Sequence, residues 1–506
     1  MPLAKALSIS LYGMTGRLIE VEADISSNLP AFVLVGLPDA SVNESAARVR
    51  AATTNSKLPL PGRRITVNLS PASVPKQGSG FDLAIAMATL SAAGTVDQNL
   101  LAKTVFLGEL SLDGSIKPIT GILTAVIAAK QLEMAKVVVP LGNLAEAQLV
   151  SGIEIRAFDH LTQLVASLGV NIKAREIRFE KVYQAESAGA VPCFSEVVGQ
   201  PEALEALKVA AVGGHNLLML GPPGAGKTML ASRLPGILPE LTEDQAIELC
   251  SVQSLAKLPI LDLPKAPPIQ APHHTASLVS MVGGGGAQPK PGLISLAHNG
   301  VLFLDEAPEF QSSVLEALRQ PLESGFVTIS RASGQATFPA RFQLVLAANP
   351  CPCGFAIGTG KECTCSSVAK TRYLNRISGP LSDRLDLRLE LNSVNAALVS
   401  EGQSIGSTSK ELKDLVTQAR AASRERLKHT PWVTNSEVSG SFLRRELRLP
   451  KTVTSALDRA LDRAFISMRG YDRCLKVAWS LADLRGANSP DSSDLATAIF
   501  LRGAEI

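Results

Sequence analysis

The stretch that decides the fold is NLLMLGPPGAGKTMLASRL, residues 216–234. Its apolar residues 217–220 have the length and composition of a buried strand, and a helix-forming segment follows the glycines. The residues between them fit G-x-x-x-x-G-K-[ST] in the strand–loop–helix context that this motif requires. Glycines let backbone N–H groups curl around phosphate oxygens, and the N-terminus of the following helix adds partial positive charge. A chance glycine-rich turn would rarely meet all these conditions, so we expect a phosphate-binding loop.

Each position of this loop has an expected role. Lys227 would reach the β- and γ-phosphates of a nucleoside triphosphate, and the hydroxyl of Thr228 would ligate Mg²⁺. The main chain of the preceding residues would surround the phosphate oxygens. The residues expected to bind the nucleotide are Gly221, Pro222, Pro223, Gly224, Ala225, Gly226, Lys227 and Thr228.

Two further apolar strands end in residues suited to the same chemistry. NGVLFLDE (299–306) ends in Asp305, which could hold the magnesium ion, and Glu306, which could orient or deprotonate the attacking water. Two adjacent acids are often only a surface turn, but their position after VLFL and downstream of a phosphate loop favours catalysis. FQLVLAAN (342–349) ends in Asn349, which could sense the γ-phosphate or position the water. Together these elements predict an ATPase that uses ATP and Mg²⁺.

Length and composition bound the remaining possibilities. The 506 residues should form several domains, because single cores stop growing near ~250–300 residues. The net charge is only +3, but residues 410–506 carry 17 basic against 12 acidic residues, which would suit a polyanion or simply a solvated helical surface. With no apolar run of secretory or membrane-spanning length, we expect a cytoplasmic protein without a membrane partner.

The chain divides into four regions by pattern. Residues 1–172 mix strand and helix patterns, and 173–193 are polar and aperiodic, as in a linker. Residues 194–393 alternate strands with helices as in a parallel α/β sheet, interrupted by a cysteine-rich insertion at 350–366. Residues 394–506 have helical patterns after a short Gly/Ser-rich stretch.

The motifs now resemble a known family. GPPGAGKT, VLFLDE, AANP and LSDRLDL, in this order, look like an AAA+ ATPase of the magnesium-chelatase clade. APHHTAS, GGGGAQPKPGLISLAHNGVLFLDE and ANPCPCG are similar to the ComM/YifB group of magnesium-chelatase-like proteins, over essentially the whole chain. The resemblance implies an AAA+ P-loop α/β core, a C-terminal helical lid and a homo-hexameric ring with ATP clamped between neighbouring subunits. It also implies a DNA motor for branch migration or helicase activity in recombination of incoming DNA, with recombination proteins as candidate partners.

Ring assembly assigns an arginine finger. In GPLSDRLDL (379–387), Arg384 matches the residue that this clade inserts toward the neighbour's γ-phosphate, a role suited to a fixed guanidinium charge. The alternative is a salt bridge to Asp383 or Asp386.

The resemblance also implies a lid sensor and an adenine-binding segment. Arg469, Arg473 and Lys476 share one helix face, and one of them should be the nucleotide sensor of the lid. We favour Arg473, and a solvated basic stripe explains the other two. EVVGQPEAL (196–204) resembles the segment that encloses the adenine, with candidates Val198, Gly199 and Gln200.

Residues 1–172 resemble the protease domain of Lon-type enzymes, a ribosomal-S5-domain-2-like α+β fold. PKQGSGFDLAIAMATL (75–90) and FLGELSLDGSIKPITGIL (106–123) correspond to its serine and lysine motifs. The nucleophile position falls on Gly80 and the lysine position on Ala125. Ser79 is adjacent, but without that lysine no base would activate it. We therefore expect a scaffold that is not a protease.

Four of the seven cysteines lie in PCPCGFAIGTGKECTCS (350–366). The spacing is C-x-C, nine residues, then C-x-C, which differs from the C-x₂₋₄-C pairs of common structural zinc sites. We expect a structural Zn²⁺ here, with a redox pair or unbound thiols as the alternatives; the ligands would be Cys351, Cys353, Cys363 and Cys365. The remaining cysteines, at 193, 250 and 474, are expected to be small hydrophobes.

Two insertions bear on the substrate. HHTASLVSMVGGGGAQPKPG (273–292) is glycine-rich, and GFVTISRASGQATFPARF (325–342) predicts a β-hairpin turning at 332–335. The resemblance implies that both face the pore of the ring, where polar residues could touch a phosphate backbone: His273, His274, Lys290 and Arg331. A chelatase-type or chaperone remodeller of a protein partner is the alternative to a motor on single-stranded or branched DNA.

Overall fold

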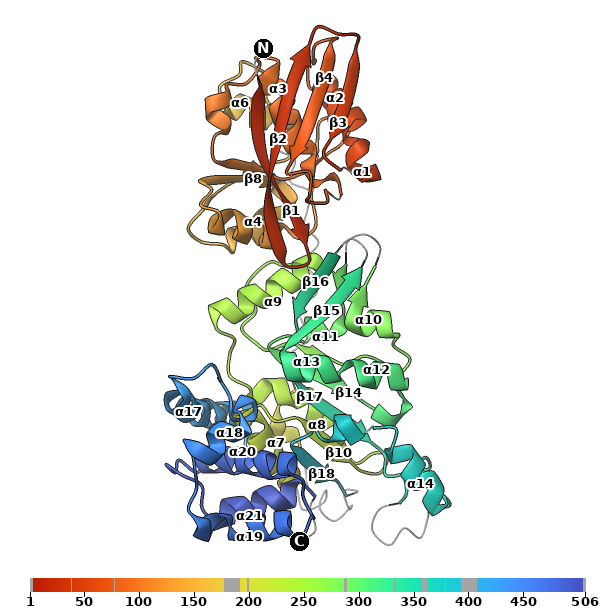
Figure 1. Cartoon of the computed structure of the whole chain (residues 1–506), viewed down its shortest axis with the longest axis vertical. Coiled ribbons are helices and arrows are strands. Elements are labelled where there is room, and N and C mark those ends of the chain that lie inside the picture. Colours follow the sequence, from red (N-terminus) through yellow and green to blue (C-terminus); the bar gives the residue numbers. More distant parts are fainter. Residues whose placement is uncertain are drawn as a thin grey trace.

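The computed structural model describes residues 3–37, 39–76, 78–176, 192–197, 200–285, 289–331, 334–356, 363–377, 379–392 and 407–503. In Figure 1 the N-terminal region (red to orange) occupies one end of an elongated molecule, and the parallel sheet (green) lies in the middle. The C-terminal helices (blue) lie beside the other end. Within the described ranges, no helix is both long and apolar enough to cross a membrane.

The N-terminal region is built on a mixed seven-stranded sheet, ordered β3-β4-β2-β1-β5-β8-β9. Antiparallel pairing joins β1, β2 and β4, while the other neighbours are parallel. The strands are β1 (Ala4–Tyr12), β2 (Thr15–Ser26), β3 (Ala31–Val35), β4 (Arg64–Ser70), β5 (Thr104–Phe106), β8 (Lys136–Pro140) and β9 (Glu154–Phe158). The main helices are α2 (Ser45–Asn55), α3 (Asp82–Ala92), α4 (Ile122–Gln131), α5 (Leu144–Gln148) and α6 (Leu161–Ser167). Every residue of α3 is buried, as its nearly continuous apolar and small residues require.

The central region contains a five-stranded sheet, ordered β11-β14-β17-β10-β18, in which all neighbours run parallel. The strands are β11 (Ile269–Gln270), β14 (Gly300–Leu304), β17 (Phe342–Ala348), β10 (Leu217–Leu220) and β18 (Leu387–Glu390). β10 and β14 are buried throughout, since helices cover a parallel sheet on both faces. This confirms the predicted α/β region. Parallel pairing also brings the carboxyl ends of these strands to one edge.

Helices and insertions surround this sheet. α7 (Pro201–Gly213) and α8 (Lys227–Arg233) flank β10, and α12 (Ser312–Ala317) and α13 (Arg319–Ser324) follow β14. The first insertion contains α10 (Leu278–Val282) and the two-residue strands β12 (Gly283–Gly284) and β13 (Lys290–Pro291). The second is an antiparallel hairpin of β15 (Phe326–Arg331) and β16 (Gly334–Pro339), which confirms that prediction; its turn, residues 332 and 333, lies outside the described residues.

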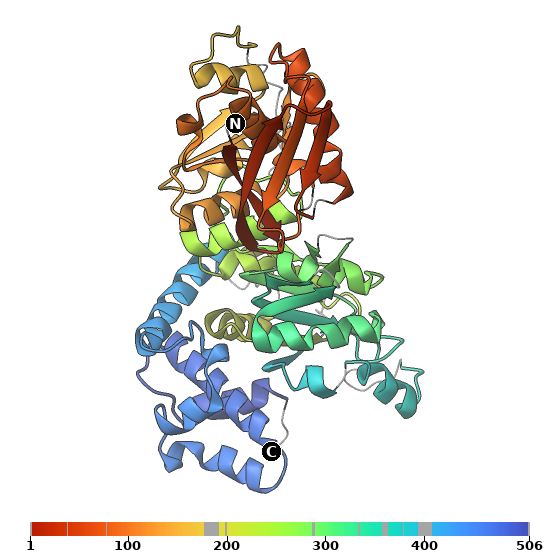
Figure 2. The same ribbon diagram turned by 45° about the horizontal axis from the view of Figure 1, so that its top comes forward.

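The N-terminal region rests on α9 (Glu243–Leu255) and the hairpin (Figures 1 and 2). α4 packs along α9, and a Cβ on Gly121 would lie 3.0 Å from Leu255. The turn between β1 and β2 meets the hairpin, because a Cβ on Gly13 would lie 3.1 Å from Cβ of Ala336. The second insertion is therefore covered on one side by the N-terminal region.

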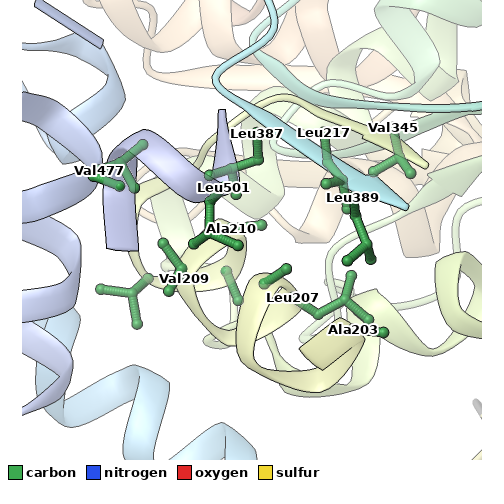
Figure 3. Packing of buried hydrophobic residues seen from close by; sticks show 14 of the residues in the cluster. Ala203, Leu207, Val209, Ala210, Leu217, Val345, Leu387, Leu389, Val477 and Leu501 are labelled. Carbon is green, nitrogen blue, oxygen red and sulfur yellow. The ribbon is translucent and has the colours of Figure 1, made fainter. Parts of the chain in front are cut away.

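The C-terminal helices share a core with the parallel sheet. They are α17 (Ser409–Leu427), α18 (Gly440–Arg445), α19 (Lys451–Asp462), α20 (Met468–Leu484) and α21 (Ser492–Leu501). Figure 3 shows Val477 and Leu501 on the helical side of the cluster that includes Ala210, Leu217 and Leu387. This continuous apolar contact fixes the helices against the start of β10 and β18.

Candidate nucleotide site and cysteine cluster

The phosphate loop leaves the carboxyl end of β10 and enters α8. Gly224 and Gly226 have φ angles of +80° and +85°, in the left-handed region that favours glycine. The N–H of Gly221 donates to the carbonyl of Ala348 at 3.2 Å, which joins the start of the loop to the end of β17. The loop therefore starts at the same edge of the sheet as Asp305 and Asn349, the polar residues predicted at the ends of the other two strands.

Lys227 connects the loop to Asn349. Its Nζ donates to the carbonyls of Gly221 at 2.7 Å and Pro222 at 2.9 Å, and to Oδ1 of Asn349 at 3.0 Å. Burial lowers the pKa of this amine, although the charges of Asp305 and Glu306 oppose that effect. A phosphate anion would favour the charged amine, so the group is poised for such a ligand.

The two acids after β14 have different partners. Oδ2 of Asp305 accepts a hydrogen bond from the hydroxyl of Thr228 at 2.6 Å, and Oδ1 accepts one from the backbone N–H of Glu306 at 2.9 Å. Glu306 has a left-handed backbone, with φ +51°, and its carboxylate lies 3.3 Å from Nδ1 of His274. Asp305 is thus directed to the loop, as a shared magnesium site with Thr228 requires. His274, which the sequence grouped with DNA-facing residues, instead lies beside Glu306.

Part of the expected adenine segment lies near the same strand ends. Nε2 of Gln200 donates to the carbonyl of Asn392 at 3.0 Å, just beyond β18. The N–H of Leu391 donates to the carbonyl of Leu220 at 2.7 Å, so this position adjoins the start of the phosphate loop. Val198 and Gly199 lie outside the described residues.

The four cysteines predicted as metal ligands converge although residues 357–362 between them lie outside the described residues. Their Sγ atoms all lie within 4.8 Å of one another, and the Sγ atom of Cys351 is 3.2 Å from that of Cys353 and 3.7 Å from that of Cys363. Tetrahedral zinc with Zn–S bonds of about 2.3 Å would separate its sulfurs by about 3.8 Å. The hydrogen bond from the N–H of Phe355 lowers the pKa of the Cys353 thiol. In Cys365 a backbone bond at Cys353 lowers the pKa, but bonds with the neighbouring thiols and burial outweigh it and raise the pKa. The cluster could therefore hold a zinc ion.

The cluster also contacts the phosphate loop. Gly354 lies in the left-handed region, with φ +86°, and its N–H donates to the carbonyl of Cys351 at 3.0 Å. A Cβ at this position would lie 2.6 Å from Cδ of Pro223, so only glycine allows this approach. Beyond the insertion and α14 (Ser367–Leu374), Arg376 donates to the carbonyl of Pro308 at 2.9 Å, in the segment after Glu306. The insertion therefore touches the phosphate loop, and the residues that follow it contact the segment after Glu306.

Arg384 lies at the opposite edge of the sheet. Its carbonyl accepts from Nδ2 of Asn216 at 3.0 Å, and the backbone N–H of Asn216 donates to Asp386 at 3.2 Å. Asn216 directly precedes β10, whereas the phosphate loop follows it. A four-residue strand spans about 13 Å at ~3.3 Å per residue, so Arg384 lies about this far from the phosphate loop of its own chain.

The side chain of Arg384 forms an ion pair with Glu323 of α13. This differs from the alternative drawn from the sequence, in which its partner was Asp383 or Asp386. Asp383 instead lies 3.8 Å from Arg469, and Asp386 pairs with Arg473. Glu323 is 61 residues away from Arg384 in sequence, and no local sequence pattern predicts a contact at that separation.

The basic face of α20 lies beside Arg384. Nη1 of Arg473 donates to the carbonyl of Arg384 at 3.3 Å, and Nζ of Lys476 donates to the carbonyl of Ser436 at 2.7 Å. Arg469 differs from both because 73% of its side chain is exposed. All four basic residues line a cleft of about 610 Å³ between the sheet and the C-terminal helices.

Asp386 holds this arrangement together from inside the protein. Its buried carboxylate contacts Arg473 and lies 3.3 Å from Nδ1 of His215, whose Nε2 is 2.8 Å from the hydroxyl of Ser480. Burial alone would raise the pKa of Asp386, but the charge of Arg473 and the bond to His215 bring it below its usual range. The ionised carboxylate thus joins the start of β18 to α20.

The N-terminal region offers no Ser–Lys pair at the predicted positions. Gly80 lies in a short 3₁₀ helix, and Ala125 is buried in α4. Within the described residues, the hydroxyl of Ser79 is bonded to the carboxylate of Glu109. Lys76, which the sequence reading did not single out, is fully buried, its amine bonded to the carbonyl of Pro71 and its pKa lowered by burial. The absence of peptidase activity stays a prediction.

The remaining predicted residues lie on the surface or in the core as follows. Cys250 and Cys474 are buried, and burial raises the pKa of each thiol to about 11. Cys193 is partly buried. Lys290 and Arg331 are exposed and lie near one glycine: Lys290 pairs with Gly284 in the β12–β13 ladder, and a Cβ on Gly284 would lie 3.5 Å from Nη2 of Arg331.

Comparison with known proteins agrees with this geometry. Residues 193–399 match the family described as magnesium chelatase, subunit ChlI. Residues 21–143 match subunit ChlI of Mg-chelatase, and 406–502 match the ChlI C-terminal family. Competence protein ComM of Haemophilus influenzae is 41% identical over 506 residues, which cover 99% of this chain and 98% of the relative.

The chain belongs to the ComM/YifB family of magnesium-chelatase-like AAA+ ATPases. The uncharacterized protein YifB of Escherichia coli is 40% identical to this chain, and the match covers 97% of this chain and 94% of the length of YifB. The magnesium-chelatase 38 kDa subunit of Rhodobacter capsulatus is 28% identical, and the match covers 31% of this chain and 50% of the length of that subunit. The AAA+ ATPase family accounts for the convergence of loop, acids and Asn349 at one sheet edge, and implies ATP and Mg²⁺ as its ligands.

Proposed function

We propose that this protein hydrolyses ATP in a ring and uses the energy to move DNA. The observation that carries the hydrolytic part is the pair of contacts that join the phosphate loop to its neighbours, Lys227 to Asn349 and Thr228 to Asp305. Thr228 and Asp305 would hold magnesium, Lys227 would bind the phosphates, and Asn349 would sense the γ-phosphate. Glu306 would take the proton of the attacking water.

The ring is supported by the position of Arg384. It lies at the amino edge of the sheet, so a fixed positive charge faces away from the chain's own nucleotide and toward a cleft with further basic residues. In a ring, this edge of one subunit would meet the loop edge of the next, and Arg384 would exchange Glu323 for the neighbour's γ-phosphate. We propose Arg469, in place of the favoured Arg473, as the lid residue that reaches the same nucleotide, because Arg469 is exposed. Arg473 is bound to Asp386 and to the carbonyl of Arg384, and would hold the Arg384 backbone in place.

Zinc in the cysteine cluster would brace the nucleotide site. The sulfur separations fit a tetrahedral ion, and four thiolates are a ligand set that zinc prefers. A closed Cys₄ site would stabilise a loop that is too polar to form a core of its own. The close contact of Gly354 with the ring of Pro223 would then restrain the phosphate loop as well. The ion is proposed as structural, with no part in hydrolysis.

DNA as the substrate rests on two supports. A relative of 41% identity bears the name competence protein, and the exposed Lys290 and Arg331 lie together around Gly284 at the insertions. Basic side chains at such a surface would contact phosphates without reading sequence, as a translocating motor requires. Homo-hexamer formation and work on branched or single-stranded DNA complete the proposal.

A subunit-mixing experiment tests hydrolysis and the ring together. Lys227→Ala should lose ATP binding, and Arg384→Ala should bind ATP without hydrolysing it. Mixed rings should recover activity, because an intact loop in the Arg384→Ala subunit then meets an intact finger from the Lys227→Ala subunit. Arg388→Ala, an exposed change on β18, is the matched control and should hydrolyse ATP normally. No recovery in verified mixed rings would contradict an arginine acting between subunits.

A further inference from the structure

The cleft between the sheet and the C-terminal helices is lined by more cations than acids. Its acidic side chains are already engaged, because each of them bonds a basic side chain or a backbone N–H: Glu240, Glu323, Asp383, Asp386 and Glu437. Arg420, Arg424 and Lys476 also line the cleft, and within the described part of the chain none of them bonds a carboxylate. These cations are therefore available to an anionic ligand.

Two of these cations gather at the C-terminal end of α7. Nε of Arg420 donates to the carbonyl of Ala211 at 2.8 Å, and Nζ of Lys476 donates to the carbonyl of Ser436 at 2.7 Å. A Cβ on Gly214, which directly follows α7, would lie 3.2 Å from Oγ of Ser436. Basic side chains of α17 and α20 thus meet over the end of α7.

The third cation adds a like charge. Arg420 and Arg424 lie one turn apart on α17, a spacing at which two equal charges repel each other. Nη1 and Nη2 of Arg420 bond none of the described residues. Burial, together with the charge of Arg424, lowers the pKa of the Arg420 guanidinium to about 10, although the charge of Glu437 opposes this. A charge that is removed from water without a counter-ion is costly, and a bound anion would relieve that cost.

A polar acceptor lies beside the same cations. Nε2 of Gln343 on β17 donates to the carbonyls of Ala210 and His215 at 3.0 and 2.8 Å, next to the carbonyl that Arg420 bonds. Oε1 of Gln343 is buried and accepts no hydrogen bond from the described residues, although Gln343 lines the cleft. An N–H or O–H of a ligand would satisfy this oxygen. The cleft volume of about 610 Å³ is within the usual range for small-molecule sites.

We propose that this end of the cleft is a second ligand site, which binds a nucleoside phosphate such as ADP. Arg420, Arg424 and Lys476 would bind its phosphates. Oε1 of Gln343 would accept a hydrogen bond from its base or ribose. The site is separate from the phosphate loop of the same chain, because the end of α7 precedes β10 whereas the loop follows it. The site requires neither the proposed ring nor DNA.

Calorimetric titration of full-length Lys227→Ala protein with ADP tests this, because the phosphate loop of this variant should not bind nucleotide. A single ADP should bind per chain. Arg424→Ala in the same background should raise its Kd by about 10-fold or more, the effect expected for loss of one charge-assisted contact. Arg459→Ala, an exposed change on α19 outside the cleft, is the matched control and should leave Kd unchanged. Adenosine should not bind, because it has no phosphate.

Three results would overturn the second site. The first is no saturable ADP binding by the folded Lys227→Ala protein. The second is ADP binding that Arg384→Ala weakens and Arg424→Ala does not, which would place the nucleotide between subunits and also contradict the proposed role of Lys227. The third is saturable binding of a short DNA duplex, but not of ADP, that depends on Arg424, which would assign these arginines to DNA.

Discussion

Replacing Gly354 by alanine should weaken ATP binding through the contact between the cysteine cluster and the phosphate loop. Alanine in a left-handed conformation costs about 1–2 kcal/mol. Its Cβ would also lie 2.6 Å from Cδ and 2.8 Å from Cγ of Pro223, about 1 Å inside a normal carbon–carbon contact. The proline ring cannot turn away as a flexible side chain would, so the two loops must separate.

The expected size follows from these costs. Strain and overlap together disfavour the present arrangement by about 2–3 kcal/mol. If the loop binds phosphate only in this arrangement, a loss of ~2 kcal/mol raises the Kd for ATP by about 30-fold, since each 1.4 kcal/mol is tenfold. Calorimetric titration with a non-hydrolysable ATP analogue and Mg²⁺ measures this directly.

Gly379, a second glycine in the segment between β17 and β18, provides the control. Gly379 has an ordinary φ, and a Cβ there would have no neighbour within 4 Å, so Gly379→Ala should bind like the wild type. Circular dichroism would establish that both variants are folded. A Kd for folded Gly354→Ala within twofold of the wild type would refute the reasoning, because it would mean that the cluster does not shape the phosphate loop.

Three other changes have expected outcomes. Cys351→Ser combined with Cys353→Ser should release zinc and lower the Tm, measured by metal analysis and thermal unfolding; unchanged metal content would exclude these ligands. Asp386→Asn should destabilise the protein at pH 7 by about 3 kcal/mol, because it leaves buried cationic partners unpaired. The folded-state pKa of Asp386 is below its ordinary value, so its contribution to the free energy of unfolding is complete above about pH 5 and declines as pH falls. The difference in stability between the wild type and Asp386→Asn should therefore shrink below about pH 4. A difference that stays constant with pH would argue against this. Lys290→Ala with Arg331→Ala should reduce the slope of log K for DNA against log salt by about one unit per residue, measured by fluorescence anisotropy; an unchanged slope would show that neither contacts phosphate.

The nucleotide site was largely predictable because each of its elements is local. The phosphate loop, Asp305 and Asn349 each follow directly from an apolar strand, and parallel pairing brings such strand ends together without further information. The convergence of the four cysteines was also predictable, since paired spacings around a glycine-rich loop allow the loop to fold back. The hairpin followed from alternating residues on either side of a turn.

The contacts that sequence reasoning missed are long-range and depend on packing. Arg384, just before β18, pairs with Glu323 of α13, 61 residues away in sequence, and His274 lies beside Glu306 because β11 lies next to β14. The contact of Gly354 with Pro223 was not predicted, because it depends on the folded position of the insertion. The charge pattern of α20 likewise could not separate exposed Arg469 from bound Arg473, since both lie on one helix face.

The most direct test of the central claim is ATP-dependent displacement of a labelled strand from a three-stranded or Holliday-type DNA junction, with Glu306→Gln as the control. The account predicts displacement by the wild type with ATP and none by the variant, although the variant should still bind ATP and the junction. Active ATP hydrolysis without displacement, and without stimulation by any DNA structure, would contradict a DNA motor and favour an ATP-driven remodeller of a protein partner.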